Sequence, residues 1–212
     1  MCGRYTLVAG DEELIAEFGL DSCDHVAPSR NICPTQLTPV IRVRELDLKR
    51  ELKRLRWGLI PSWSKDPSSA YKMINARSEE AAAKPAFRDA VRRRRCLIPC
   101  TGFYEWKAVE GAPKKAKKQA FLFRVEGERP FAMGGIWEPW RGPSGEAIES
   151  FTILTTNANH IVSPIHDRMP VIIDPRDYEE WLDPRMLEPK RIQELLCTDA
   201  PANLIPVTVD FL

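Results

Sequence analysis

The stretch Cys-Leu-Ile-Pro-Cys-Thr-Gly-Phe-Tyr-Glu-Trp, at residues 96–106, is the longest strand-like run in the chain. Apolar, β-branched and aromatic residues in such a run favour a strand that is buried over most of its length. We therefore expect Cys96 and Cys100 to be buried strand residues, because no Cys/His pair follows them at the spacing of a zinc site. Shorter runs of similar character lie at residues 38–43, 52–59, 120–125, 131–137, 150–156, 171–173 and 204–209.

Helical periodicity is less frequent than strand patterning. Residues 11–18 carry an apolar face and end before Gly19, a typical helix C-cap. Ser78 is expected to cap a second helix, which Pro85 interrupts, and further helices are expected at 174–182 and 189–196. Because strands outnumber helices and do not alternate with them, the sequence predicts an α+β fold with a curved, mostly antiparallel sheet. No repeat, linker or composition break appears, so a single domain is expected over residues 1–212.

Composition is that of an ordinary globular protein, with 43% hydrophobic and 29% charged residues and a net charge of +1. No run reaches the roughly 18 apolar residues of a membrane span, and the N-terminus lacks a signal pattern. We therefore expect a cytoplasmic, nucleoid-associated protein whose cysteines are reduced. Of two basic clusters, residues 92–95 indicate either a solvated helix end or a phosphate-facing patch, and residues 114–118 indicate a hairpin loop.

The chain begins Met-Cys-Gly-Arg, and Cys2 carries unusual chemistry if Met1 is removed. It then presents an α-amine with a pKa near 7.7–8.0 beside a thiol with a pKa near 8.5. The amine of such a 1,2-aminothiol condenses with an aldehyde to an imine, and the thiolate can close onto the imine carbon. The alternative is an incidental residue at a frayed terminus.

Two further segments combine polar and apolar residues. In Met-Ile-Asn-Ala-Arg-Ser-Glu, at 73–79, Asn75 and Arg77 precede a helix start, where they suit a phosphate or act as turn and cap residues. In Thr-Gly-Phe-Tyr-Glu-Trp-Lys, at 101–107, Glu105 lies among apolar neighbours. Such a carboxylate is either a buried ion-pair member or an acid/base group with a raised pKa.

Two other segments complete the candidate chemistry. Pro-Ile-His-Asp-Arg-Met-Pro, at 164–170, brings together an imidazole at His166, a carboxylate and a guanidinium. Trp-Gly-Leu-Ile-Pro-Ser-Trp, at 57–63, has a core tryptophan, Trp57, and a second, Trp63, that either stacks on a base or joins the core. The other histidines, His25 and His160, are interpreted as surface or structural residues.

Taken in order, these segments resemble one family, the SRAP (SOS response-associated peptidase) family. The matching segments are Met-Cys-Gly-Arg-Tyr at 1–5, Asn-Ile-Cys-Pro-Thr-Gln at 31–36, Trp-Gly-Leu-Ile-Pro-Ser-Trp at 57–63, Ile-Asn-Ala-Arg-Ser-Glu at 74–79, Gly-Phe-Tyr-Glu-Trp at 102–106 and Ile-His-Asp-Arg-Met-Pro at 165–170. Each segment alone is weak evidence, whereas six in the family's order are specific. The resemblance implies the SRAP fold, in which the sheet forms a pseudo-barrel with a few peripheral helices.

The resemblance also implies a function in DNA repair and the SOS response. A protein of this family shields abasic sites in single-stranded DNA by forming a covalent DNA–protein crosslink. Cys2 would form a Schiff base with the ring-opened aldehyde and close it to a thiazolidine. Glu105 and His166 would move protons, and Asn75 would orient the sugar. No cofactor, metal or membrane is implied, and a monomer is expected.

Family resemblance further implies a DNA-binding groove around these catalytic residues. The candidate contacts to the backbone or bases are Arg4, Asn31, Pro34, Trp63, Arg77, Thr155 and Arg168. Trp63 would wedge against a base and so favour single strands or junctions.

Two other functions are compatible with a Met-Cys-Gly start. Class II glutamine amidotransferases and other N-terminal-nucleophile hydrolases use such a cysteine to attack an amide. A related possibility is a thiol peptidase that cleaves its own N-terminus. The non-enzymatic alternative is a DNA-binding module in which Cys2 is structural.

Overall fold

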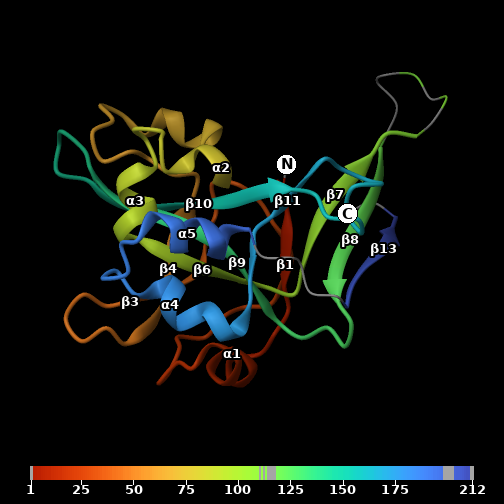
Figure 1. Ribbon diagram of the computed structural model, residues 1–212, viewed down its shortest axis with the longest axis horizontal. Coiled ribbons are helices and arrows are strands. Elements are labelled where there is room, and N and C mark those ends of the chain that lie inside the picture. Colours follow the sequence, from red (N-terminus) through yellow and green to blue (C-terminus); the bar gives the residue numbers. More distant parts are fainter. Residues whose placement is uncertain (1, 110, 112, 114–117, 198–202, 211–212) are drawn as a thin grey trace.

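The computed structural model describes residues 2–109, 111, 113, 118–197 and 203–210 (Figure 1). Its strands are β1 (Tyr5–Leu7), β2 (Ser29–Ile32), β3 (Leu37–Val43), β4 (Arg50–Trp57), β5 (Asn75–Arg77), β6 (Arg95–Cys100), β7 (Gly102–Lys107), β8 (Gln119–Val125), β9 (Phe131–Arg141), β10 (Ala147–Asn157), β11 (Arg168–Pro170), β12 (Ile172–Ile173) and β13 (Leu204–Val209). Its helices are α1 (Asp11–Phe18), α2 (Ser78–Ala81), α3 (Arg88–Arg93), α4 (Tyr178–Leu182) and α5 (Pro189–Leu196), with 3₁₀ turns η1 (Pro67–Lys72) and η2 (Pro175–Asp177).

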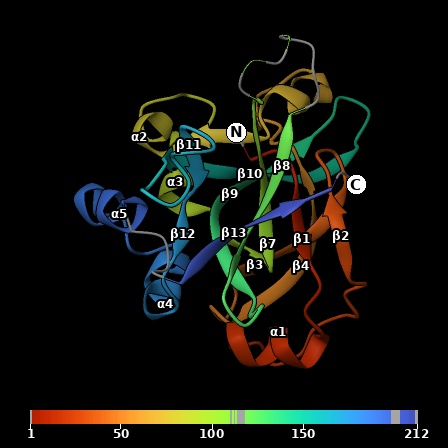
Figure 2. The same ribbon diagram turned by 90° about the vertical axis from the view of Figure 1, so that its right-hand side faces the viewer.

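Five strands close into a barrel. The order β10–β4–β3–β6–β9 returns to its start because β10 also pairs with β9 along its length. Only the pairings of β10 with β4 and with β5 are parallel among those of the described strands. A second sheet, β13–β8–β7–β1–β2, lies beside the barrel (Figure 2). The predicted α+β fold with a curved, mostly antiparallel sheet forming a pseudo-barrel is confirmed.

The barrel interior accounts for the uninterrupted apolar runs of the sequence. Every residue of β6 is buried, since the interior covers one of its faces and helices cover the other. A Cβ on Gly135 of β9 would clash with the Ile98 side chain and lie 2.9 Å from the Thr152 carbonyl oxygen. Trp57 is fully buried, as predicted, and its ring lies 5.3 Å from that of Tyr5.

The run at 96–106 is not one strand, and this expectation was wrong. The chain leaves the barrel at Thr101 and enters the second sheet as β7. The break is stabilised by β1, because the Thr101 hydroxyl lies 2.9 Å from that of Thr6 and accepts from the backbone N–H of Val8. The two cysteines of the run, Cys96 and Cys100, are buried in β6 as expected.

The helices largely follow the sequence. Helix α1 has the predicted bounds and ends at Gly19, whose φ of 60° is the left-handed conformation that glycine adopts most readily. Ser78 was expected to be the N-cap of its helix, but it is the first residue of helix α2 and is buried. Asp174 does cap the next segment, because its side chain accepts from the backbone N–H of Arg176. Helix α5 has the predicted bounds.

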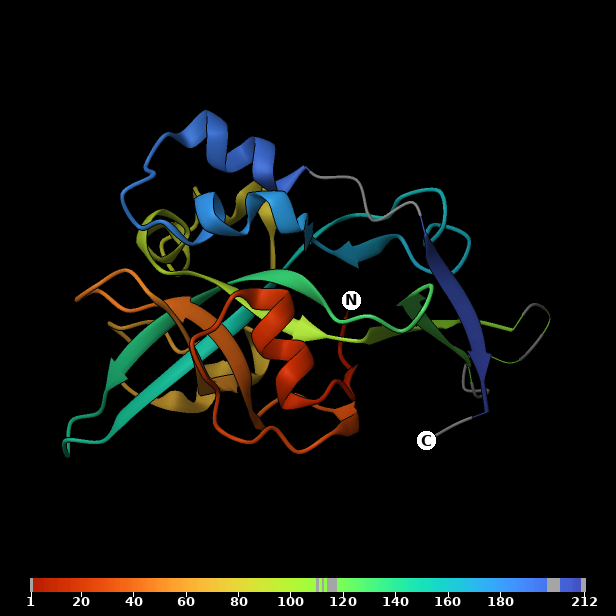
Figure 3. The ribbon, with the colours of Figure 1, turned by 90° about the horizontal axis from the view of Figure 1, so that it is seen from below.

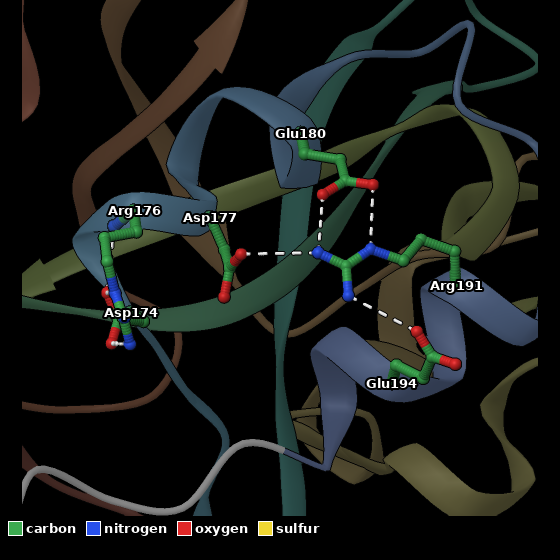
Figure 4. Close-up of polar contacts among 6 residues, drawn as sticks. All are labelled: Asp174, Arg176, Asp177, Glu180, Arg191 and Glu194. Atoms are coloured by element: carbon green, nitrogen blue, oxygen red, sulfur yellow. Dashed lines mark hydrogen bonds and ion pairs between the residues drawn. The ribbon is translucent and has the colours of Figure 1, made fainter.

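Helices α4 and α5 lie together on one side of the barrel (Figure 3). An ion-pair network joins them, in which Arg191 contacts Glu180 at 2.6 Å, Glu194 at 3.3 Å and Asp177 at 3.4 Å (Figure 4). Arg95, from the arginine run, is buried beneath them and donates to the carbonyl oxygen of Trp181.

The two basic clusters have different outcomes. Arg92 and Arg93 form an exposed helix end, as one of the two interpretations predicted, whereas Arg94 pairs with Glu138 and Arg95 is buried. Most of the lysine cluster, at 114–117, lies outside the described residues. None of the helices in the described part of the chain is both long and apolar enough to cross a membrane.

Candidate active site

The proposed catalytic residues come from four separate parts of the chain. Strand β1 pairs with β7 in the register Tyr5↔Phe103, so the segment before β1 runs back along β7 towards Glu105. Asn75, at the start of β5, donates from Nδ2 to the carbonyl oxygen of Cys2 at 2.8 Å. His166 lies in the loop before β11, with Nε2 3.7 Å from Oε2 of Glu105. The fold therefore brings residues from positions 2, 75, 105 and 166 into one site.

Asn75 is more than a turn residue. Its strand pairs with β10 at Ile153, which fixes the position of the amide. Nδ2 holds the N-terminal segment, while Oδ1 is buried without a hydrogen-bond partner among the described residues. Leaving a buried acceptor unpaired costs about 1–3 kcal/mol. A ligand that donates to Oδ1 recovers this cost.

Glu105 has the environment of an acid/base group. Its side chain is almost fully buried, and this burial raises its pKa to about 7. Burial has the opposite effect on its neighbour, because it lowers the pKa of the His166 imidazole. Burial therefore favours the neutral form of both groups.

The backbone orients the His166 ring. The backbone of Arg168 holds Nδ1 from two sides, with its N–H at 3.0 Å and its carbonyl oxygen at 3.2 Å, so Nδ1 is satisfied whether it accepts or donates. Nε2 is the nitrogen that faces Glu105. The carboxylate of Asp167, which is 87% exposed, lies 3.0 Å from Nδ1 and favours the imidazolium when it forms.

The thiol of Cys2 is fully buried beside these groups. Burial raises the pKa of this thiol, and the nearby charge of Glu105 raises it further. Its Sγ lies 3.9 Å from the carbonyl oxygen of Arg4. The thiol is therefore protonated at neutral pH and needs a base before it can act as a nucleophile.

The candidate DNA contacts divide into two groups. Arg4 donates to the Oδ1 of Asn31 at 3.1 Å on the surface, Arg77 is exposed, and Trp63 is 67% exposed rather than part of the core. Pro34 is half-buried on the loop after β2.

Thr155 and Arg168 are both buried. The Arg168 guanidinium makes two 2.8 Å bonds to the Glu79 carboxylate and further bonds to Asn157 and Thr155, which tie β11 to α2 and β10 (Figure 2). In this arrangement the two residues position the His166 loop rather than face a phosphate. Glu79, in the 73–79 segment, was not predicted to be the partner of Arg168.

Two hollows elsewhere on the surface, of about 370 and 790 Å³, are lined by none of the proposed catalytic residues. Among the described residues, no group of three His, Cys, Asp or Glu side chains is placed to hold a metal ion.

One known family matches nearly the whole length of the chain. The family model described as SOS response associated peptidase (SRAP) matches residues 1–210. The chain belongs to the SRAP family. Among SRAP relatives, the abasic site processing protein YoqW of Bacillus subtilis (strain 168) is 39% identical over 199 residues, covering 92% of this chain and 86% of the relative. The abasic site processing protein HMCES of Mus musculus is 31% identical over 192 residues, covering 76% and 54%.

Solved structures share the SRAP fold seen here. A Bacteroides thetaiotaomicron protein superposes with a TM-score of 0.85 at 26% identity, covering 99% of this chain and 92% of that one. A phage-related protein of Bordetella bronchiseptica gives a TM-score of 0.78 at 29% identity, covering 98% and 94%.

Proposed function

We propose that this SRAP protein recognises abasic sites in single-stranded DNA and traps their aldehyde on Cys2. The observation that carries the proposal is the convergence of a buried cysteine, an amide with a free acceptor and a carboxyl–imidazole pair in one site. Relatives named abasic site processing proteins support the substrate class.

The reaction requires that Met1 be removed, so that Cys2 supplies both amine and thiol. The ring-opened abasic sugar presents a C1′ aldehyde. The amine adds to this carbon, and loss of one water gives an imine. The thiol then adds across the C=N bond, sulfur to carbon and proton to nitrogen, which closes a five-membered thiazolidine. The net change is condensation with release of one water, and no oxidant or cofactor enters the balance.

Glu105 and His166 manage the protons of this sequence. The Glu105 carboxylate accepts the thiol proton, since it lies near enough to Cys2 for its charge to raise the pKa of the thiol, and it returns a proton to nitrogen. His166, through Nε2, exchanges protons between Glu105 and the surface. The same groups can move a proton to O4′ during sugar ring opening. Burial raises the pKa of Glu105 to about 7 and lowers the pKa of His166, which suits proton transfer in both directions, and we expect the crosslink to be reversible.

Binding and orientation fall to the surrounding residues. Asn75 fixes the Cys2 backbone and offers Oδ1 to a sugar hydroxyl or to the thiazolidine N–H. Arg4, Asn31, Pro34 and Arg77 contact the backbone of the strand. Trp63 stacks on a base, and the buried pair Thr155 and Arg168 supports the His166 loop from below.

A peptidase or amidase role for Cys2 is less well supported. Thiol peptidases with a Cys–His pair lower the pKa of their thiol with a nearby cation. Here burial and Glu105 raise the pKa of the Cys2 thiol instead. Condensation with an aldehyde tolerates this environment, because the neutral amine attacks first.

The test is incubation with single-stranded DNA that carries one abasic site, followed by denaturing electrophoresis. We expect a shifted band that survives denaturation for the unmodified protein and none for C2A. C2S should give only a labile imine band, because its hydroxyl is a poorer nucleophile. C197A is the matched control, since Cys197 is an exposed cysteine outside the site.

A C2A protein with a stable shift as strong as that of the unmodified protein would overturn the proposal. Release of ammonia from glutamine would support an amidotransferase instead. Reversible binding of the same DNA, with no covalent band under any condition, would support a binding module with a structural cysteine.

A further inference from the structure

The 790 Å³ hollow is a groove on the outside of the barrel, remote from the proposed catalytic residues. One wall is the open end of the β3–β4 hairpin, away from its turn, and it contributes Leu37, Arg54 and Arg56. The other wall is the outer part of the β9–β10 hairpin, which contributes Trp140 and Arg141. The groove therefore lies between two hairpins of the same barrel.

The strand register explains why a groove forms at this place. Strand β10 pairs with β4 only at Ser150↔Arg56 and Phe151↔Trp57, while its pairing with β9 continues outward to Ala147↔Arg141. The β9–β10 hairpin thus separates from β4 and leaves a gap beside it. Because Leu37 is opposite Arg56 and Pro39 is opposite Arg54, apolar and basic side chains share one face of the β3–β4 hairpin.

The charge of the groove is strongly positive. Arg54, Arg56 and Arg141 line it, and none of them forms an ion pair with a described carboxylate, although Arg54 donates to the carbonyl oxygen of His25 at 2.9 Å. The one carboxylate among the described lining residues is Glu149, and Arg42 already neutralises it from beside the groove at 2.6 Å. Three arginines without counter-ions, in a protein whose net charge is only +1, indicate an anionic ligand.

The groove continues from the proposed DNA-binding surface. Its lining residue Thr35 follows Pro34, and Trp140 donates from Nε1 to the carbonyl oxygen of Ser64 at 2.8 Å, next to Trp63. All three ribbon views show the turn between β9 and β10 beside segment 61–72 (Figures 1, 2 and 3). A strand that passes Trp63 on its way out of the site therefore reaches this groove.

We propose that the groove binds the sugar–phosphate backbone of the DNA that flanks the lesion, on one side of it only. Arginine guanidinium groups hold phosphate oxygens in bidentate fashion, and the exposed Leu37 packs against a sugar. The inference rests on the proposed function for the identity of the strand. It extends the footprint of the protein beyond the residues around Cys2 and gives the two flanks unequal roles.

The test is equilibrium binding to single-stranded DNA without any lesion. One oligonucleotide has a core of about eight nucleotides, and two others extend it by about ten nucleotides at the 5′ or at the 3′ end. For the unmodified protein, one of the two extensions should tighten binding. In the triple variant R54A/R56A/R141A this gain should fall about tenfold, and the slope of log K against log salt should decrease by about 2 for three lost phosphate contacts.

A charge-matched control is R129A/R176A/R185A, whose three exposed arginines lie outside the groove and outside the proposed DNA surface. This variant should keep the gain from the extension. Equal losses in both triple variants, equal sensitivity to both extensions, or no gain from either extension in the unmodified protein would each overturn the inference.

Crosslinking of an abasic core oligonucleotide by the unmodified protein is measured in parallel. Because the binding assay uses undamaged DNA, failure of the crosslink would refute the proposed function without affecting the result for the groove. A normal crosslink with no flank effect would refute only the groove.

Discussion

The substitution E105Q isolates the cost of keeping a carboxyl group buried at the active site. Glutamine has the same shape but does not titrate. The pKa of Glu105 is raised from 4.5 to about 7 by burial, so the folded state holds its proton more tightly than the unfolded chain does. The free energy of unfolding of the unmodified protein therefore falls as the pH rises from 4.5 through 7. In E105Q the free energy of unfolding does not fall for this reason, because glutamine does not titrate.

The size of the effect follows from the pKa difference. Each unit of pKa corresponds to about 1.4 kcal/mol, so complete deprotonation of Glu105 lowers the free energy of unfolding by about 3 kcal/mol. Between pH 5 and pH 8, E105Q should gain about 2–3 kcal/mol relative to the unmodified protein, or roughly 5–10 °C in Tm for a chain of this size. Crosslinking should slow at the same time, since the variant cannot accept the thiol proton.

Thermal or urea unfolding at several pH values measures this difference. E79Q is the contrasting control, because the Arg168 guanidinium lowers the pKa of Glu79 and the ionised form stabilises the fold. E79Q should therefore be less stable than the unmodified protein at pH 8, and its deficit should shrink as the pH falls. A stability difference for E105Q that does not change with pH would refute the reasoning, because Glu105 would then be a structural residue with no raised pKa.

Three further predictions concern DNA affinity, anchoring and packing. W63A should weaken binding of single-stranded DNA by about 1–3 kcal/mol with an unchanged Tm, measured by titration, whereas L46A, at an even more exposed apolar residue, should leave affinity unaltered. N75A should lower the rate of crosslinking at normal Tm, because the N-terminal cysteine loses its anchor, and a normal rate would exclude this role. G135A should lower the Tm strongly, since its Cβ would lie 2.9 Å from the backbone oxygen of Thr152. G134A should lower the Tm less, because its Cβ would lie 3.1 Å from the flexible side chain of Ile173, and equal losses of Tm would contradict the packing argument.

Local sequence signals predicted most helices and strands of this fold. The apolar face and terminal Gly19 defined α1 to the residue, because both signals act within a few positions. The break at Thr101 could not be predicted, because a hydrogen bond between the hydroxyls of Thr101 and of Thr6, in another strand, stabilises it. Closure of the barrel depends on the parallel pairing of β10 with β4, and no turn or spacing in the sequence predicts this pairing.

The candidate site shows the same division. Cys2, Glu105 and His166 were candidates by residue type, the family resemblance supplied their expected roles, and the fold brings their segments together. The burial of Arg168 could not be anticipated, because its partner Glu79 lies 89 residues away in the sequence. The basic groove was also missed, because its arginines come from two hairpins and form no cluster in the sequence.

The central claim is that the reactive species begins at Cys2 and condenses with an aldehyde. Intact-mass measurement of the purified protein, before and after reaction with an abasic oligonucleotide, tests it most directly. The account predicts a protein that lacks Met1 and an adduct whose mass is the sum of protein and DNA minus one water. An adduct formed on protein that retains Met1 would contradict the account. So would an adduct whose mass after denaturation equals the full sum of protein and DNA, with no water lost.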